Sequence, residues 1–245
     1  FLKPYETMVY DVSEQQLAAL TAAYPVNVAE NNIQIARECE FIILAIKPIY
    51  MRGVLEEIQK YCYNKKIISI AAGWSMAMLT EILGRDNSAQ VLRVMPNTPA
   101  LVGKGVFALC FDDKVPAESK EDILRFFSQL GVCLELPESR FTAFSALIGA
   151  GPAYVFGMMQ GLVQAGVTLG LGRKDCRDMV AALFEGSAVM AARSDTPLME
   201  LRDQVCSPGG LTIAGVNVLD RAGLSGLLVD AVLAADERGR EMEKE

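Results

Sequence analysis

The sequence predicts an α/β domain built on a doubly wound parallel sheet, followed by an all-helical domain. Three observations predict this architecture. Short β-rich runs alternate with helical patterns over residues 1–137, as in strand–helix–strand units. Residues 139–245 show helical patterns and no convincing strand run. The change in character falls at Pro137–Arg140, with no long flexible linker, so the predicted domains are residues 1–138 and 139–245.

In the first domain, apolar runs indicate strands, and apolar residues at helical spacing indicate helices. Phe41–Ile46 is a continuous apolar run, typical of a strand buried on both faces of a parallel sheet. Ser13 and Gln16 form a capping-box pattern that predicts the start of the first helix. The expected strands are Met8–Tyr10, Val26–Val28, Phe41–Ile46, Ile67–Ile70, Gln90–Met95, Phe107–Phe111 and Cys133–Leu136, with further helices at 30–39, 51–59, 75–83 and 116–130.

The second domain is predicted to contain helices at 152–170, 174–193, 197–204, 211–222 and 225–243. Residues 141–172 carry no charged side chain, and this length exceeds the ~20 residues that span a bilayer. However, seven glycines, Pro152, Gln160 and Gln164 interrupt the stretch. We therefore expect a buried helix or a subunit interface there rather than a membrane span.

Composition excludes several classes of function. The net charge is −7, with 30 acidic and 23 basic residues and no basic stripe, so no nucleic-acid partner is expected. The chain has no histidine, which excludes imidazole catalysis and a histidine metal site, and no metal is predicted. The six cysteines are widely spread without a CxxC pair, which favours free thiols in a reducing cytoplasm. The first residues lack the apolar segment of a signal peptide.

A doubly wound sheet favours a dinucleotide at the carboxyl ends of its strands. The glycine fingerprint GxGxxG that should follow the first strand is not in this sequence. We therefore expect that the first strand, the glycine loop and most of the first helix are missing from it; the alternative is that no dinucleotide site exists.

Asp11 bears on this choice, because it ends the first visible strand, where an acidic side chain binds the ribose hydroxyls of NAD. With Glu14 nearby and no Lys or Arg in the following turn, Asp11 favours NADH over NADPH. The alternative is an ordinary Asp before a helix with a serine cap.

Two further loops follow predicted strands. In Ala45-Ile46-Lys47-Pro48, Pro48 keeps the backbone of Lys47 extended at the sheet edge. Lys47 then lies along the phosphates or ribose of a cofactor, or is simply a solvated loop lysine. In Arg93-Val94-Met95-Pro96-Asn97-Thr98-Pro99-Ala100, two prolines hold Asn97 and Thr98 in a rigid turn where an amide faces a ligand, unless the turn is only structural.

The segment Ser207-Pro208-Gly209-Gly210-Leu211-Thr212 directly precedes a predicted helix. Its backbone N–H groups converge at the positive end of that helix, an arrangement that binds a carboxylate or phosphate without a charged side chain. An ordinary helix cap is the alternative, although a cap needs one serine and not a glycine turn.

Four motifs, in this order and spacing, cover essentially the whole chain: AIKP at 45–48, VMPNTPA at 94–100, GAGPAYVF at 149–156 and SPGGLT at 207–212. Together they resemble the pyrroline-5-carboxylate reductases. The resemblance implies reduction of 1-pyrroline-5-carboxylate to L-proline by hydride transfer from NAD(P)H, the last step of proline biosynthesis. It also implies a Rossmann domain and a helical domain that interlocks two subunits, in a homodimer that often assembles further into a decamer of five dimers.

The resemblance also implies residue roles. The cofactor contacts it implies are Asn32, Ala45, Lys47, Pro48 and Asn97, with Ala71, Ala72, Gly73, Met95 and Pro96 on the nicotinamide side. Asp11, from its position after the first strand, and Ile46, within the Ala45–Pro48 loop, complete the expected cofactor contacts. The residues implied for the substrate carboxylate are Ser207, Gly209, Gly210, Leu211 and Thr212, and the Thr212 hydroxyl lies beside the imine nitrogen as the catalytic group. Leu211 departs from the small or hydroxyl residue usual there, which narrows the pocket but keeps the backbone N–H.

Two other classes of function remain open. One is a related reductase of another cyclic imine or of a small acid. The hydroxyacid enzymes place a lysine on the helix between domains, whereas Ala150–Gly172 contains none. The other is a non-catalytic relative that has lost the glycine loop.

Overall fold

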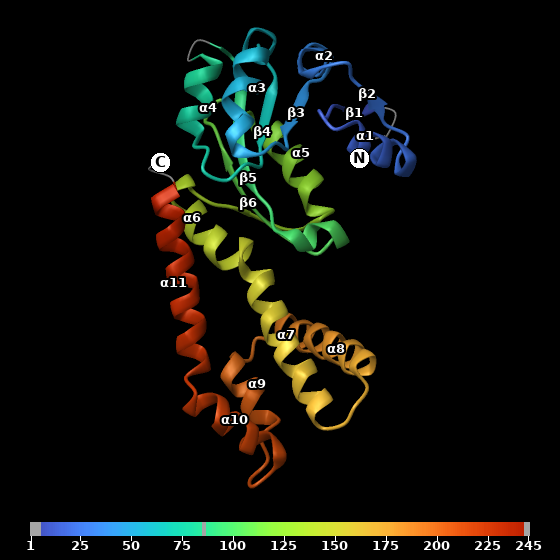
Figure 1. Ribbon diagram of the computed structural model, residues 1–245. Coiled ribbons are helices and arrows are strands. Elements are labelled where there is room, and N and C mark those ends of the chain that lie inside the picture. The colour runs from blue at the N-terminus through green and yellow to red at the C-terminus, as the bar shows by residue number, and fades with distance from the viewer. Residues whose placement is uncertain (1–5, 85–86, 243–245) are drawn as a thin grey trace. The chain divides into compact units, whose positions relative to one another are not determined.

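The computed structural model describes residues 6–84 and 87–242 (Figure 1). The chain forms two compact units, Phe1–Gly149 with Arg238–Glu245, and Ala150–Glu237. We refer to them as unit 1 and unit 2. The division at Gly149 lies inside a helical run, whereas the predicted boundary near Pro137–Arg140 marks the end of the strand patterns. The two boundaries differ because the first divides the chain into compact units and the second marks where the predicted type of element changes.

Unit 1 contains strands and helices in alternation (Figure 1). They are β1 (Met8–Val9), α1 (Glu14–Ala23), β2 (Asn27–Val28), α2 (Asn32–Glu38), β3 (Phe41–Leu44), α3 (Met51–Ile58), β4 (Lys66–Ser69), α4 (Met76–Leu83), β5 (Gln90–Met95), β6 (Gly105–Phe111), α5 (Ala117–Ser128), β7 (Gly131–Glu135) and α6 (Phe141–Phe144). The strands form a two-stranded sheet, β1-β2, and a five-stranded sheet in the order β3-β4-β5-β6-β7.

The five-stranded sheet is mixed rather than wholly parallel. Strands β3, β4 and β5 are parallel, but β6 runs antiparallel to β5, and β7 is parallel to β6. The expected parallel sheet is confirmed for β3, β4 and β5, and the antiparallel β6 departs from it. The connection between β5 and β6 spans only Pro96 to Lys104, whereas a parallel crossover needs about a dozen residues or more.

Helices cover both faces of this sheet, and each face has its own apolar cluster (Figure 1). Because successive strand residues point to opposite faces, Ile67 packs with the cluster of α3 and α4, while Ile68 packs with that of α5. The first cluster includes Leu44, Leu55, Leu79 and Val91; the second includes Leu92, Leu109, Phe107, Ile123 and Phe127. Burial on both faces explains the apolar run of β5. In β3 only Ile42 and Leu44 are buried, whereas Phe41 and Ile43 are exposed, so the expectation that this strand is buried on both faces is wrong.

Several helices of unit 1 begin where the sequence places a cap. The Ser13 hydroxyl accepts a hydrogen bond from the Gln16 N–H at 3.3 Å, as the capping-box pattern predicts. Ser75 accepts from the Met78 N–H at 3.1 Å, and Asn31 accepts from the Gln34 N–H at 2.9 Å. These side chains satisfy backbone donors that the first turn leaves without a partner, and so fix where each helix begins.

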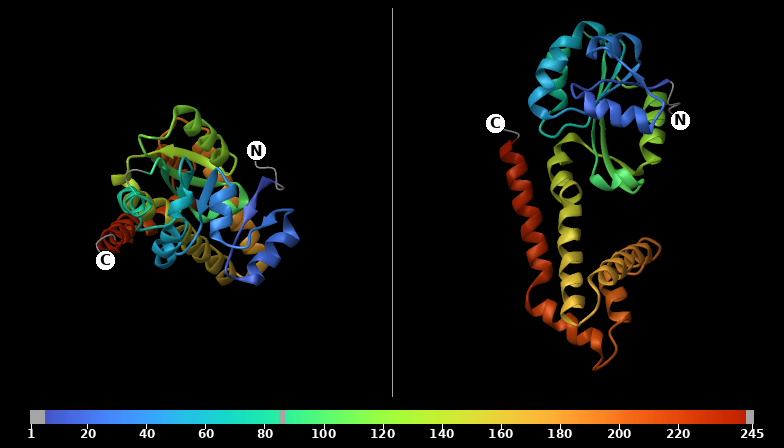
Figure 2. Two further views of the ribbon diagram at one scale, coloured as in Figure 1. Left: turned by 90° about the horizontal axis from the view of Figure 1, so that it is seen from above. Right: turned by 45° about the vertical axis from the view of Figure 1, so that its right-hand side comes forward.

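Unit 2 is helical, with α7 (Gly151–Thr168), α8 (Arg173–Ala192), α9 (Leu198–Gln204), α10 (Leu211–Arg221) and most of α11 (Leu224–Met242) (Figure 2). Helices α7 and α8 pack through Val163, Cys176 and Val180, which are buried. A π-helical turn, Ser145–Gly149, connects α6 to α7. By length and composition alone, the helical stretch Glu138–Thr168 is long and apolar enough to cross a membrane.

Candidate active site

The residues expected to bind the cofactor in unit 1 follow the carboxyl ends of strands. Ala45–Pro48 comes after β3, Ala71–Gly73 after β4, and Met95–Asn97 after β5. Because these three strands are parallel neighbours, the three loops lie at one edge of the sheet. The Trp74 Nε1–H donates to the Pro48 carbonyl at 3.0 Å, which ties the first loop to the second.

The first two loops leave backbone open to a ligand. Lys47 is exposed with φ −64° and ψ 142°, the extended conformation that Pro48 was expected to impose. Gly73 has φ +75°, and no heavy atom lies within 4 Å of the position that a Cβ would take. Ala71 is buried beneath, while Ala72 is exposed. This backbone is therefore accessible to a flat ring.

Asp11 follows β1, and Asn32 is the first residue of α2, the helix that follows β2. Asp11 is exposed, and its Oδ1 accepts the Ser13 N–H at 2.8 Å. The Asn32 Nδ2–H donates to Glu57 Oε2 at 2.8 Å. Asp11 therefore also shapes its own turn, which is the structural alternative that the sequence left open.

Asn97 is engaged with the protein at both ends of its amide. Its Oδ1 accepts the Val106 N–H at 2.9 Å, and its Nδ2–H donates to the Ile148 carbonyl at 3.3 Å. The side chain thereby links the end of β5 to β6 and to the π-helical turn before α7. This bridge is a structural role that the motif did not reveal; a contact with the cofactor stays a prediction.

The turn at Ser207–Thr212 belongs to unit 2 and is described apart from the sheet edge. Gly209 has φ +69°, and Gly210 precedes α10, where no side chain caps the helix among the described residues. A Cβ on Gly210 would lie 2.3 Å from the Ser207 Oγ. Leu211 and Thr212, the first residues of α10, are exposed. The helix start therefore presents backbone N–H groups on an open surface, as an anion site requires.

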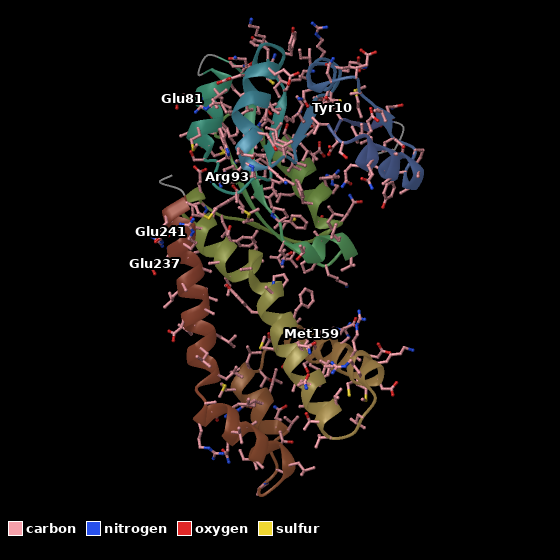
Figure 3. The ribbon with its side chains drawn as sticks, in the orientation of Figure 1. Tyr10, Glu81, Arg93, Met159, Glu237 and Glu241 are labelled. Atoms are coloured by element: carbon pink, nitrogen blue, oxygen red, sulfur yellow. The ribbon has the colours of Figure 1, made fainter. Side chains whose placement is uncertain are left out.

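Sequence reasoning missed a charged pair in which the arginine is buried. Arg93 lies within β5 and is 5% exposed (Figure 3). Its Nη1 lies 2.6 Å from Glu138 Oε1. Cys110 is the register partner of Arg93 across β5 and β6, and burial raises the pKa of its thiol. An arginine inside the otherwise apolar run VLRVM was the available signal.

The donor set of unit 1 fits a dinucleotide. Loops after successive strands present exposed backbone, one cation at Lys47 and one carboxylate at Asp11. A doubly wound sheet binds dinucleotides at this edge, with an acid for the ribose and positive groups for the phosphates. The open side of Gly73 gives a flat ring access to the backbone between them.

Two family models match the chain. Residues 138–242 match the one described as pyrroline-5-carboxylate reductase dimerisation, and residues 3–73 match the one described as NADP oxidoreductase coenzyme F420-dependent. A solved structure, Plasmodium falciparum pyrroline carboxylate reductase with NADP bound, has a TM-score of 0.89 at 33% identity, covering 98% of this chain and 88% of that one.

Curated relatives match over nearly the whole length. The pyrroline-5-carboxylate reductase of Corynebacterium melassecola is 35% identical and aligns over 99% of this chain and 91% of its own. The enzyme of the same name from Escherichia coli is 33% identical, over 98% and 89% respectively. With its order of motifs, its mixed sheet and its helical second half, this chain belongs to the pyrroline-5-carboxylate reductase family.

Proposed function

We propose that this protein reduces 1-pyrroline-5-carboxylate to L-proline with NAD(P)H, the last step of proline biosynthesis. The observation that carries the proposal is the Ser207–Thr212 turn, because its uncapped helix start offers backbone N–H groups that can hold the carboxylate of a small substrate. The sheet edge of unit 1 supports the second requirement, a dinucleotide site.

The substrate is bound by its carboxylate and oriented by its ring nitrogen. The N–H groups at the start of α10 hold the carboxylate, and the Thr212 hydroxyl holds the nitrogen and relays a proton to it from water. The bound NAD(P)H supplies the hydride. Protonation makes the C=N carbon electrophilic, so correct placement does most of the remaining work, worth about 7–11 kcal/mol of the barrier. This explains how the reaction proceeds in a chain without histidine.

The experiment that tests the function is oxidation of NADH or NADPH by the full chain, followed by absorbance at the nicotinamide band. Oxidation that requires 1-pyrroline-5-carboxylate, with proline as the product, supports the proposal. Faster oxidation with a six-membered cyclic imine, or with a small oxoacid that is reduced to the hydroxyacid, would identify the related reductase. No oxidation with any of them would identify the non-catalytic relative.

Thr212 is the residue whose replacement tests the mechanism. Thr212→Ala removes the hydroxyl from the imine nitrogen, and we expect turnover to fall by about 10²–10³-fold, as when one oxyanion donor is lost. Thr212→Ser keeps the hydroxyl and should retain most of the activity. Unchanged turnover and substrate affinity in Thr212→Ala would refute this role.

We propose that NADH is favoured slightly over NADPH. The exposed Asp11 carboxylate accepts ribose hydroxyls, and it repels a phosphate at the same position. Glu14 adds negative charge in the next turn. Asp11→Ser should raise kcat/KM for NADPH relative to NADH, and a ratio that does not change would remove Asp11 from cofactor selection.

We propose that the protein is a cytoplasmic homodimer, with a decamer of five dimers as its larger assembly. The apolar surface of unit 2 supports the dimer, and six free cysteines suit a reducing compartment. Light scattering coupled to gel filtration separates the two assemblies, because they have two and ten times the mass of one chain.

A further inference from the structure

We infer that Arg93 is a positioning residue for the nicotinamide end of the cofactor. The inference rests on the cofactor contacts proposed above. Arg93 stands in the middle of β5, where its neighbours Leu92 and Val94 are buried in the apolar core. Burying a cation costs several kcal/mol unless it is paired and hydrogen-bonded. We therefore expect Arg93 to have a role that an apolar side chain of similar size could not perform.

Arg93 connects three separate segments of unit 1. Its Nη1 donates to Glu138 Oε1 at 2.6 Å, and the same oxygen accepts the backbone N–H of Met76 at 2.7 Å. The Arg93 guanidinium also lies over the Phe141 ring, with Cζ 4.8 Å from the centroid. The pair therefore fixes β5 to the first residue of α4 and to the start of α6.

These are the segments that carry the expected nicotinamide contacts. Ala71–Gly73 ends just before the first turn of α4, which Glu138 holds at Met76. Met95 lies two residues after Arg93 on β5, and residues two apart on a strand share one face. Arg93, Met95, Ala72 and Gly73 all contribute to the wall of one cavity of about 70 Å³.

Glu138 gives this connection its geometry. A carboxylate that binds the guanidinium and a backbone N–H with one oxygen sets the distance between β5 and α4. Charge-assisted hydrogen bonds of this kind are shorter and stronger than neutral ones. The Arg93–Glu138 pair thereby keeps the Ala71–Gly73 backbone and Met95 at a fixed separation on either side of the nicotinamide ring. The expected cofactor contacts Asp11 and Asn32 lie after β1 and at the start of α2, where Asp11 accepts the Ser13 N–H and Asn32 donates to Glu57, so their hydrogen bonds run to residues other than Arg93 and Glu138.

The test compares two ligands that differ at the nicotinamide end. NADH carries the ring, whereas ADP-ribose ends before it. In the full chain, Arg93→Met should weaken NADH binding at least tenfold and leave ADP-ribose binding within twofold of wild type. Arg93→Lys restores a cation and should recover part of the NADH affinity. Arg125→Met, which removes an exposed arginine paired with Asp122 on α5, should change neither affinity.

Equal weakening of both ligands, or no change in either, would overturn the inference, because a general loss of structure does not discriminate between them. If Arg93→Met does not fold, Glu138→Gln carries the same comparison, since it removes the charge and keeps an oxygen for the Met76 N–H. The binding comparison uses no imine. A wild-type protein that binds NADH but does not reduce the pyrroline acid would refute the proposed function. The comparison of NADH binding with ADP-ribose binding would still test the role of Arg93.

Discussion

At the scale of single residues, Asn97 shows how a motif residue serves the fold. Its amide accepts from Val106 and donates to Ile148. Asn97→Ala leaves the Val106 N–H and the Ile148 carbonyl without these partners, so we expect the free energy of unfolding to fall by about 1–3 kcal/mol. Urea denaturation measures this change. Asn97→Asp keeps the acceptor for Val106 and should lose less, and an equal loss in both variants would contradict the assignment.

Cys62 provides a pH-dependent prediction. Burial raises the pKa of its thiol to about 11. The folded state therefore holds this proton more tightly than the unfolded state does. The thiol makes its whole contribution to the free energy of unfolding at pH values below its ordinary pKa. As the pH rises from there to about 11, the unfolded chain ionises first and stability falls. We expect Cys62→Ala to flatten this decline in denaturation midpoints measured between pH 8 and 11. An unchanged slope would show that other groups cause it.

Most cofactor residues that the sequence predicted lie on loops after strands, because position in the chain determines their position at the sheet edge. Lys47 and Gly73 are examples. Arg93, Glu138 and Trp74 were missed because each acts through a partner far away in the sequence. A local sequence pattern does not show how far apart β5 and the start of α6 lie in the folded chain. The carboxyl ends of strands are therefore predictable, and the contacts that hold them are not.

At the scale of elements, helix and strand positions followed from local patterns. Strand β5 has the predicted bounds, and α10 begins at Leu211 after the glycine turn as expected. The direction of β6 did not follow, because direction depends on the length of a connection rather than on the apolar run. Pro96 to Lys104 is long enough for a turn but too short for a crossover helix.

The pairing of β6 with β7 depends on a glycine. Gly131 has φ +151°, and a Cβ there would lie 1.9 Å from the Gly105 carbonyl oxygen. Gly131→Ala must therefore push the two strands apart, and we expect a loss of about 3 kcal/mol or more in the free energy of unfolding. Gly53 in α3 has no heavy atom within 4 Å of its Cβ position. Gly53→Ala should be neutral or stabilising by up to about 1 kcal/mol, and a similar loss in both would contradict this account.

At the scale of the whole molecule, the two units differ in how much core they contain. Unit 1 has apolar clusters on both faces of its sheet. In Ala150–Glu237, all of which the structure describes, the buried apolar side chains are Val163, Cys176 and Val180. Large apolar side chains such as Phe156, Met179 and Leu183 are exposed there. So small a core does not stabilise a unit of this size, and exposed apolar surface on this scale marks an interface.

We therefore expect the protein to fold only as a dimer that buries this surface. Its Tm should rise with protein concentration, because unfolding separates the subunits. Phe156→Glu places a charge on α7 at a side chain 64% exposed in the single chain, and it should lower the Tm and the dimer fraction in sedimentation. Tyr63→Glu is the matched control in unit 1, where the tyrosine is 66% exposed, and should change neither. A folded monomer at micromolar concentration, with a Tm independent of concentration, would show that unit 2 is stable without a partner.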